Sequence, residues 1–432
     1  MRAMPISRRR LLTTGGSLVG ITLAGGLAAA CGSNTGREGG GSSNAPALSQ
    51  WYHQYGEPGA EQAVKRYAHA YRKAKVTVQW RPGNYDQQTA AALLTDSGPD
   101  VFEVNGPTLD QIRGGQVVDL TDLISNDVRG DFNPTVLAPK IYDGKVWGIP
   151  QVIDTQLLYY RKSLLSDAGV EPPRTLDALV DAAKTLTEKL KDKKTKGLFL
   201  GNDGGVGVLG GTPLFAAGLS LITEDGKVGF DDPGAARALG KVHQLYAEKS
   251  LLLGAPADWS DPSAFIQGLT AMQWSGLWAL PQIKKALGDD FGVLPFPKDG
   301  ANGKPAVPVG AYATAVSARS KDKAAAKAYA KWLWVERTDY QEDFALSYGF
   351  HIPARTSLAK KAERLREGAA ADAVRLATEC GYAEPLLWTP AAKVAYQDAL
   401  SRVIKDGANP ESELRAVVRK TDAELRRVRK SA

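Results

Sequence analysis

The chain has 432 residues, only two cysteines and a formal net charge of +7. The first 30 residues contain four arginines and no acidic residue, so the remaining 402 residues carry +3, too small an excess to indicate a nucleic-acid-binding protein. A body of this length exceeds one usual hydrophobic core, which predicts two lobes.

The first 30 residues have the pattern of an export signal. A basic block, Ser7-Arg8-Arg9-Arg10-Leu11-Leu12, is followed by residues 11–30 without any charge. The twin arginine resembles the bacterial Tat signal, and the small residues before Cys31 resemble the lipobox at which lipoproteins are cleaved and acylated, although Ala28 stands where that box usually has Leu. A retained transmembrane segment is the alternative, which the weakly apolar, glycine-rich composition disfavours.

Residues 31–47 follow as a predicted lipidated cysteine and flexible tether. Residues 32–47 are rich in Gly, Ser and Asn, and such a chain reaches about 20 to 25 Å. If Cys31 carries a lipid such as palmitate, Cys380 has no disulfide partner, and the exported body depends on its core for stability. The sequence thus predicts a protein anchored by lipid to the extracytoplasmic face of the bacterial cell membrane.

The next segments alternate between strand and helix patterns. Residues 48–55, 76–80 and 100–106 are expected to be strands, and residues 60–73 and 90–95 helical. This alternation is typical of parallel sheets in an α/β body.

Polar side chains follow the first and third of these strands. Ligands of α/β sheets bind at the carboxyl ends of strands, which places His53, Tyr55, Glu57 and Asn105 near one another. His53 and Tyr55 could equally face the core.

The stretch Lys145–Lys162 contains two apolar, β-prone runs separated by a polar segment. Val146–Ile149 is β-prone and stops at Pro150, which belongs at a strand end or edge, and an apolar run resumes at Leu157. Between them, Asp154 should face water, a cation or a ligand, because burying an unpaired charge is costly. One interpretation is a strand that crosses between two lobes with Asp154 at the cleft, and the other is an ordinary edge strand with an exposed Asp.

A glycine-rich loop at residues 201–211 follows a predicted helix at 175–190 and a predicted strand at 197–200. It contains a formal G-x-G-x-x-G of the dinucleotide-binding type. An exported protein has no nicotinamide pool, so no cofactor is expected. The alternative is a loop whose backbone approaches a bulky ligand, with Asn202 and Asp203 offering hydrogen bonds.

An aromatic region follows. We expect Ala271–Trp274 to be a short strand, Ser275-Gly276 a turn, and Trp278 the start of a helix that forms a wall of the cleft. Aromatic faces stack on pyranose rings, and a pocket with apolar walls and few polar anchors suits a sugar. The alternative is that Trp274 and Trp278 both belong to the core.

A set of segments, taken together and in order, resembles the family of extracellular solute-binding proteins that includes the maltose-binding protein. These segments are residues 100–102, 145–162, 271–278, 291–297, 309–312 and 349–355. The resemblance covers nearly all of the chain from Leu48 onward. It implies a two-lobed periplasmic-binding-protein-like α/β fold with hinge crossings and a central ligand cleft, with residues 48–152 plus 308–352 in the N-lobe and 153–307 plus 353–432 in the C-lobe.

The resemblance also implies site residues. Asp154 falls at a hinge carboxylate that contacts sugar hydroxyls, Trp278 and Trp388 at stacking tryptophans, Asn202 and Asp203 near a contact loop, and Tyr312 just after the Gly310 crossing. The first-lobe loop departs from the maltose binder, with His53, Tyr55, Gly56 and Glu57 in place of acidic and basic side chains, and this leaves the sugar open.

Three further helices are predicted toward the end of the chain, and the last two of them close the second lobe. Residues 324–335, 390–404 and 411–430 read as helices, and their charge runs, such as Arg426, Arg427, Arg429 and Lys430, are either solvated faces or a permease contact.

Two functional classes follow from these observations. The first is a monomeric receptor without chemistry, the substrate-binding component of an ABC importer, which hands a neutral sugar or oligosaccharide to a membrane permease driven by a cytoplasmic ATPase. A binder of a phosphorylated polyol is its variant, disfavoured by the lack of an arginine pair. The second class is a secreted glycoside hydrolase, in which Asp154 with Asp203 or Glu57 would form the carboxylate pair. With no H-E-x-x-H, no G-x-S-x-G and four scattered histidines, no catalytic or metal-binding residue is predicted.

Overall fold

The structure of the protein is a computed structural model that describes residues 45–348 and 350–430. The predicted export signal, Cys31 and nearly all of the predicted tether lie outside these residues. Across the described ranges, no helix is both long enough and apolar enough to cross a membrane.

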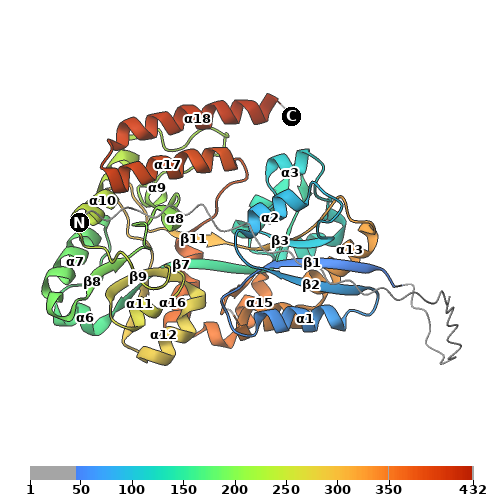
Figure 1. Ribbon diagram of the computed structural model, residues 1–432, viewed down its shortest axis with the longest axis horizontal. Helices are drawn as coiled ribbons and strands as arrows, with labels where there is room; N and C mark the ends of the chain where they lie inside the picture. Colours follow the sequence, from blue (N-terminus) through green and yellow to red (C-terminus); the bar gives the residue numbers. More distant parts are fainter. Residues whose placement is uncertain (1–44, 349, 431–432) are drawn as a thin grey trace, which may run out of the picture. The chain divides into compact units, whose positions relative to one another are not determined.

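The first sheet has five strands in the order β2-β1-β3-β12-β6, of which β1, β2 and β3 are labelled in Figure 1. They are β1 (Ala47–His53), β2 (Lys75–Arg81), β3 (Val101–Val104), β6 (Ile149–Pro150) and β12 (Ala313–Val316). β1 is parallel to β2 and β3, whereas β12 is antiparallel to β3 and β6. The three strands predicted near the start of the chain are confirmed, and Pro150 lies at the end of an edge strand as expected.

The predicted helices on this sheet differ from the structure at their ends, and a short helix after β3 was not predicted. They include α1 (Ala60–Ala70), α2 (Tyr85–Ala92), α3 (Leu109–Arg113) and α13 (Lys323–Lys331), which continues as the π-helix η5 (Trp332–Glu336). α1 buries one apolar face that contains Ala63 and Tyr67. α2 starts earlier than expected because the Asn84 side chain accepts a hydrogen bond from the Gln87 N–H and caps it.

The second sheet is built around the long strand β7 (Val152–Arg161). Its main order is β14-β11-β7-β9-β8, and β10 and β13 also pair with β7. The bounds are β8 (Lys196–Phe199), β9 (Thr270–Gly276), β10 (Phe291–Leu294), β11 (Val307–Gly310), β13 (Ile352–Pro353) and β14 (Gly381–Tyr382). Leu158 pairs with both Trp274 and Leu294, so β7 is a central strand and the edge-strand alternative is wrong. The turn predicted at Ser275-Gly276 is also wrong, because pairing with β7 keeps both residues in β9.

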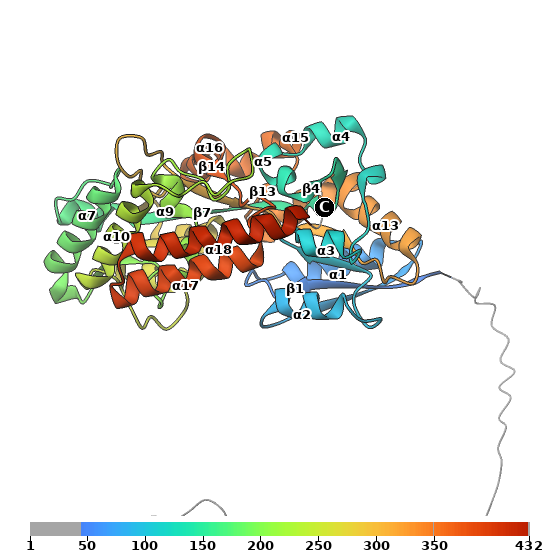
Figure 2. The same cartoon turned by 90° about the horizontal axis from the view of Figure 1, so that it is seen from above.

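Long helices cover the second sheet. They are α7 (Leu176–Lys189), α10 (Pro233–Ala247), α16 (Gly368–Cys380), α17 (Pro390–Asp406) and α18 (Pro410–Lys430). The two closing helices predicted from the sequence are confirmed as α17 and α18, which lie side by side in both views (Figures 1 and 2).

Shorter elements complete the described chain. The helices are α4 (Asn126–Asp131), α5 (Pro134–Leu137), α6 (Lys162–Asp167), α8 (Val206–Leu209), α9 (Thr212–Ala216), α11 (Ser263–Ile266), α12 (Leu280–Leu287), α14 (Thr338–Asp343) and α15 (Thr356–Lys361). Single turns are η1 (Thr121–Leu123), η2 (Ala138–Lys140), η3 (Lys191–Lys193), η4 (Leu277–Ala279), η6 (Phe344–Tyr348) and η7 (Glu363–Leu365), and β4 (Ile141–Tyr142) pairs with β5 (Lys145–Val146).

We call the elements on the five-stranded sheet the first lobe and those on the seven-stranded sheet the second lobe. The chain passes between them at Gln151, where β6 gives way to β7, and again between β11 and β12. The largest apolar cluster includes Val101 of the first sheet together with Ile153 and Tyr159 of the second. The core therefore runs through the crossings, which ties the two lobes together at this point.

Candidate ligand-binding site

A cavity of about 410 Å³ lies at the carboxyl end of β1. It is lined by His53, Gln54, Tyr55, Gly56, Gly83, Asn84, Tyr85, Asp86 and Tyr312. Its volume is within the range of small-molecule sites. Because parallel strands end at the same edge of a sheet, β3 brings Glu103 beside this cavity, as expected for an α/β ligand site.

Glu103 is the buried group that organises the cavity wall. Its carboxylate lies 2.6 Å from His53 Nδ1 and accepts a hydrogen bond from the Tyr55 hydroxyl. Burial alone would lower the pKa of His53, but the Glu103 carboxylate outweighs it and raises that pKa. The pair therefore favours an imidazolium beside a carboxylate.

Aromatic rings surround His53. The Tyr312 ring stacks on it with centroids 4.4 Å apart and an interplanar angle of 20°. Asn105, predicted to lie in the site, is exposed and interacts with the Tyr312 hydroxyl. Tyr55 is buried and its hydroxyl is committed to Glu103, so it supports the wall from behind, while His53 and Tyr312 are partly exposed and available to a ligand.

A second cluster lies where the chain crosses between the lobes. His351 is 3% exposed and forms ion pairs with Asp154 Oδ1 and, at 3.3 Å, with Glu57 Oε1. The contact with Asp154 is close, although its atoms are not aligned as a hydrogen bond. Burial would lower the pKa of His351, but the two carboxylates outweigh it and raise the pKa to about 10.

This cluster explains how Asp154 is tolerated near the start of a central strand. Its partner is a cation, and its side chain keeps 20% of its exposure, which leaves part of the carboxylate for a ligand. In the part of the chain that the structure describes, no group of His, Cys, Asp and Glu side chains is arranged to hold a metal ion. Sequence reasoning missed His351 because it read residues 349–355 only as a family segment.

Trp278 lies on η4, directly after β9. Since β9 ends opposite Gln156, the next turn lies beside the Asp154 end of β7. The Trp278 Nε1–H donates to the Ser260 carbonyl at 2.9 Å, and its ring covers Gly276, where a Cβ atom would meet the ring at 2.0 Å. The side chain remains partly exposed, which suits the expected aromatic wall better than a core position.

Asn202 and Asp203 hold the glycine-rich loop together. The Asn202 amide bonds both the carbonyl and the N–H of Ala255, and the Asp203 carboxylate accepts the N–H groups of Gly205 and Gly207 at 3.0 and 2.7 Å. These polar groups are therefore committed to the backbone, a structural role that differs from the predicted ligand contact. The loop leads into α8, which is only one turn long.

Trp388 is the clear correction among the predicted site residues. It is 7% exposed and lies in the second-lobe core, packed edge-on against Phe230 and Tyr396 with centroids 6.0 Å away in each case. Thr389 caps α17, so the residue before the cap turns back onto that helix and reaches Tyr396. The prediction that Trp388 stacks on a ligand is wrong for this structure.

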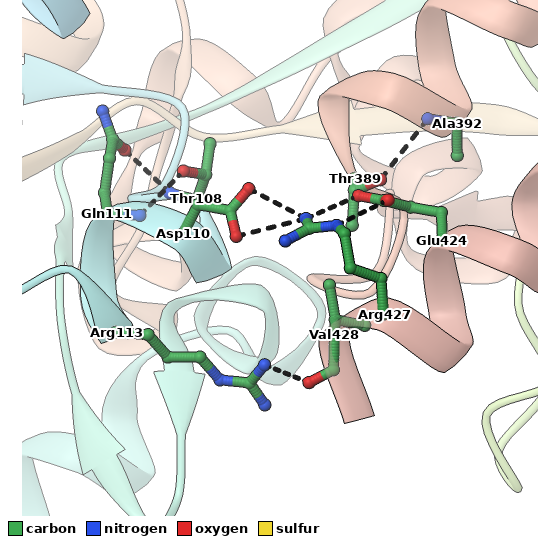
Figure 3. Close-up of polar contacts among 9 residues, drawn as sticks. All are labelled: Thr108, Asp110, Gln111, Arg113, Thr389, Ala392, Glu424, Arg427 and Val428. Carbon is green, nitrogen blue, oxygen red and sulfur yellow. Dashed lines mark hydrogen bonds and ion pairs between the residues drawn. The ribbon is translucent and has the colours of Figure 1, made fainter. Parts of the chain in front are cut away.

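Helix α18 connects the second lobe to the first at a separate place (Figure 3). Arg427 donates to both oxygens of Asp110 on α3, at 3.1 and 3.3 Å, and also pairs with Glu424. Arg113 of α3 donates to the Val428 carbonyl. We call these four residues, Asp110, Arg113, Arg427 and Val428, the α3–α18 contact. Arg427 thus pairs with the first lobe while its side chain stays about half exposed, a role that the sequence did not predict.

Comparison with known proteins places this geometry in a family. Residues 54–334 match the model of the family described as bacterial extracellular solute-binding protein. The diacetylchitobiose binding protein DasA of Streptomyces coelicolor is 28% identical over 333 residues, 73% of this chain and 74% of that protein. The maltodextrin-binding protein MdxE of Bacillus subtilis is 28% identical over 67% of this chain and 69% of its own.

Solved structures agree on the fold. An ABC transporter solute-binding protein from Thermotoga lettingae, bound with α-D-tagatose, has a TM-score of 0.74 at 22% identity and covers 88% of this chain and 100% of its own. The GacH receptor of Streptomyces glaucescens has a TM-score of 0.72 at 24% identity, covering 89% of this chain and 98% of its own. The chain has the two-lobed α/β fold that the sequence predicted, and it belongs to the family of bacterial extracellular solute-binding proteins.

Proposed function

We propose that the chain is the substrate-binding component of an ABC importer, which binds a neutral sugar or oligosaccharide between its lobes and delivers it to a membrane permease powered by a cytoplasmic ATPase. The observation that carries the proposal is the cavity at the end of β1, where the partly exposed His53 and Tyr312 rings stack above the buried Glu103. Aromatic faces bind the C–H faces of sugars, and carboxylates accept their hydroxyl protons. Relatives that are named as binding proteins for diacetylchitobiose, maltodextrin and galactooligosaccharide support the same class of ligand.

The charges around the cavity favour a neutral ligand. Asp86 lines it, Glu103 lies in its wall, and no lysine or arginine is among its lining residues within the described chain. A phosphate group would need strong cationic donors, whereas the His53 imidazolium in this lining is already paired with Glu103. The phosphorylated polyol is therefore the weaker candidate.

The carboxylates do not resemble those of a glycosidase. Asp154 and Glu57 contact the same imidazole of His351, so neither is held as a separate acid and base across a bond. We infer binding without turnover, in line with the family, whose members are solute-binding proteins.

The proposal includes the anchor. Cys31 would carry lipid and the following tether would let a monomeric body reach the permease. Palmitate labelling of cells that express the chain tests this: the wild type is expected to be labelled and Cys31→Ser is not. Labelling of both would contradict the anchor.

A thermal-shift screen of the body from Leu48 onward tests the ligand class. Maltotriose, diacetylchitobiose, raffinose and sorbitol 6-phosphate serve as probes. A ligand at one hundred times its dissociation constant stabilises a protein by about 2.7 kcal/mol. We expect a shift with at least one neutral saccharide and none with the phosphate. A shift with the phosphate alone, or with no probe, would overturn the proposal.

A further inference from the structure

Lys140 is a buried cation without a partner. It ends η2 and is only 4% exposed, its Nζ atom keeps slight contact with solvent, and among the described residues its ammonium has neither a hydrogen bond nor an ion pair. The cost of burying an unpaired charge is high, and buried lysines are normally paired. A lysine retained in this setting needs an explanation beyond packing, because a methionine would fill the same space without the cost.

The side chain ends under the loop that follows β3. A Cβ atom built on Gly106 would lie 3.7 Å from Lys140 Cε, and one built on Gly148 would lie 3.4 Å from Lys140 Cγ. Asn105, next to Gly106, interacts with Tyr312 of the cavity wall. Lys140 therefore reaches the same carboxyl edge of the first sheet as the cavity, on the β3 side.

The charge of Lys140 contrasts with that of the cavity. Burial lowers the pKa of Lys140 to about 8, so the ammonium form still dominates at neutral pH. Burial is the only cause of this shift, so no carboxylate stabilises the ammonium. The carboxyl edge of the sheet thus carries the Glu103 carboxylate within β3 and the uncompensated Lys140 ammonium under the loop that follows β3.

We propose that Lys140 is a specificity-determining residue of the ligand site, whose ammonium donates hydrogen bonds to hydroxyl oxygens of the bound sugar on the β3 side of the cleft. This inference rests on the proposed function, because a sugar long enough to contact His53 and Tyr312 would bring further hydroxyl groups toward the loop at Asn105. Binding then supplies the partners that the ammonium lacks.

The test compares Lys140→Met with Lys145→Met, the same substitution at an exposed position of the neighbouring strand β5. Calorimetric titration uses whichever of maltotriose, diacetylchitobiose and raffinose stabilises the wild type most. Hydrogen bonds to charged groups predict a 10- to 100-fold loss of affinity for Lys140→Met. Its melting temperature without sugar should equal or exceed that of the wild type, because an unpaired buried charge is removed, and Lys145→Met should match the wild type in both measurements.

Each other outcome overturns the inference. Unchanged affinity in Lys140→Met shows that the ammonium does not touch the sugar. If Lys140→Met and the polar variant Lys140→Gln both fail to fold, the lysine is structural. Tighter wild-type binding of a glucuronic-acid disaccharide than of its neutral counterpart would contradict the assignment to hydroxyl oxygens. If the wild type binds no saccharide at all, the proposed function itself is wrong. If the wild type binds a saccharide and Lys140→Met binds it with the same affinity, only the role of Lys140 is wrong.

Discussion

Replacing His351 by leucine should destabilise the protein substantially. Leucine is apolar and similar in size to histidine, but it leaves the Asp154 and Glu57 carboxylates without their shared cation. Removing one partner of a buried ion pair costs about 3 to 5 kcal/mol. The two carboxylates retain 20% and 14% exposure, so we expect the lower end of that range. For a folded body of about 390 residues, a loss of about 3 kcal/mol lowers the melting temperature by roughly 4 °C.

The pH dependence of stability gives a second measurement. The pKa of His351 rises from 6.5 to about 10 in the folded protein. A raised pKa means that its stabilisation is complete below pH 6.5 and is lost as the pH rises toward 10. The urea midpoint of the wild type should therefore fall between pH 7 and 10 by more than that of His351→Leu, a difference that cancels the titration of other groups common to both proteins.

His69→Leu is the matched control, because His69 is exposed on α1 and its loss should change stability by less than about 0.5 kcal/mol. A free energy of unfolding of His351→Leu equal to that of this control would contradict the ion-pair assignment. In that case His351 is neutral in the native protein, and the carboxylates are stabilised by other means.

Replacing Trp278 should impair ligand binding, whereas replacing Trp388 should impair stability. Trp278→Ala should abolish most of the thermal shift caused by a bound saccharide while leaving the melting temperature of the sugar-free protein within a few degrees, and Trp388→Ala should cost about 3 to 5 kcal/mol of stability measured by urea unfolding. The opposite pattern would mean that their roles are exchanged. For the α3–α18 contact, a double-mutant cycle on Arg427→Ala and Asp110→Ala should give a coupling below about 1 kcal/mol that shrinks in 1 M salt, since both side chains are about half exposed. A larger coupling that is insensitive to salt would show that the contact is effectively buried.

Local sequence patterns predicted much of the fold because they depend on neighbours in the chain. The approximate extents of α1 and α7 follow from the spacing of a few apolar residues. Trp388 was misplaced because its surroundings are set by Phe230, a residue far away in sequence, and a tryptophan before a helix cap can serve either as core or as a binding surface.

The candidate site was harder to predict than the fold for the same reason. His53, Tyr55 and Asn105 could be placed together because parallel strands end at one edge. His351 could not be predicted, since its partners Glu57 and Asp154 come from two other distant segments. Glu103 was also missed: it sits inside an apolar strand, and only the structure reveals that its carboxylate holds His53.

The two polar links between the lobes differ in a way that bears on how the protein works. His351 is buried at the crossings, whereas the Arg427–Asp110 pair of the α3–α18 contact is about half exposed and is worth about 1 kcal/mol at most. Changing a two-state equilibrium from 1:99 to 99:1 requires about 5.5 kcal/mol of differential binding. The Arg427–Asp110 pair is too weak to supply this, so under the proposed function a ligand held between His53, Tyr312 and Trp278 would have to provide most of the free energy that favours a closed state. Under the proposed function, closure would then report ligand occupancy to the permease, because without the ligand the exposed Arg427–Asp110 pair is easily broken.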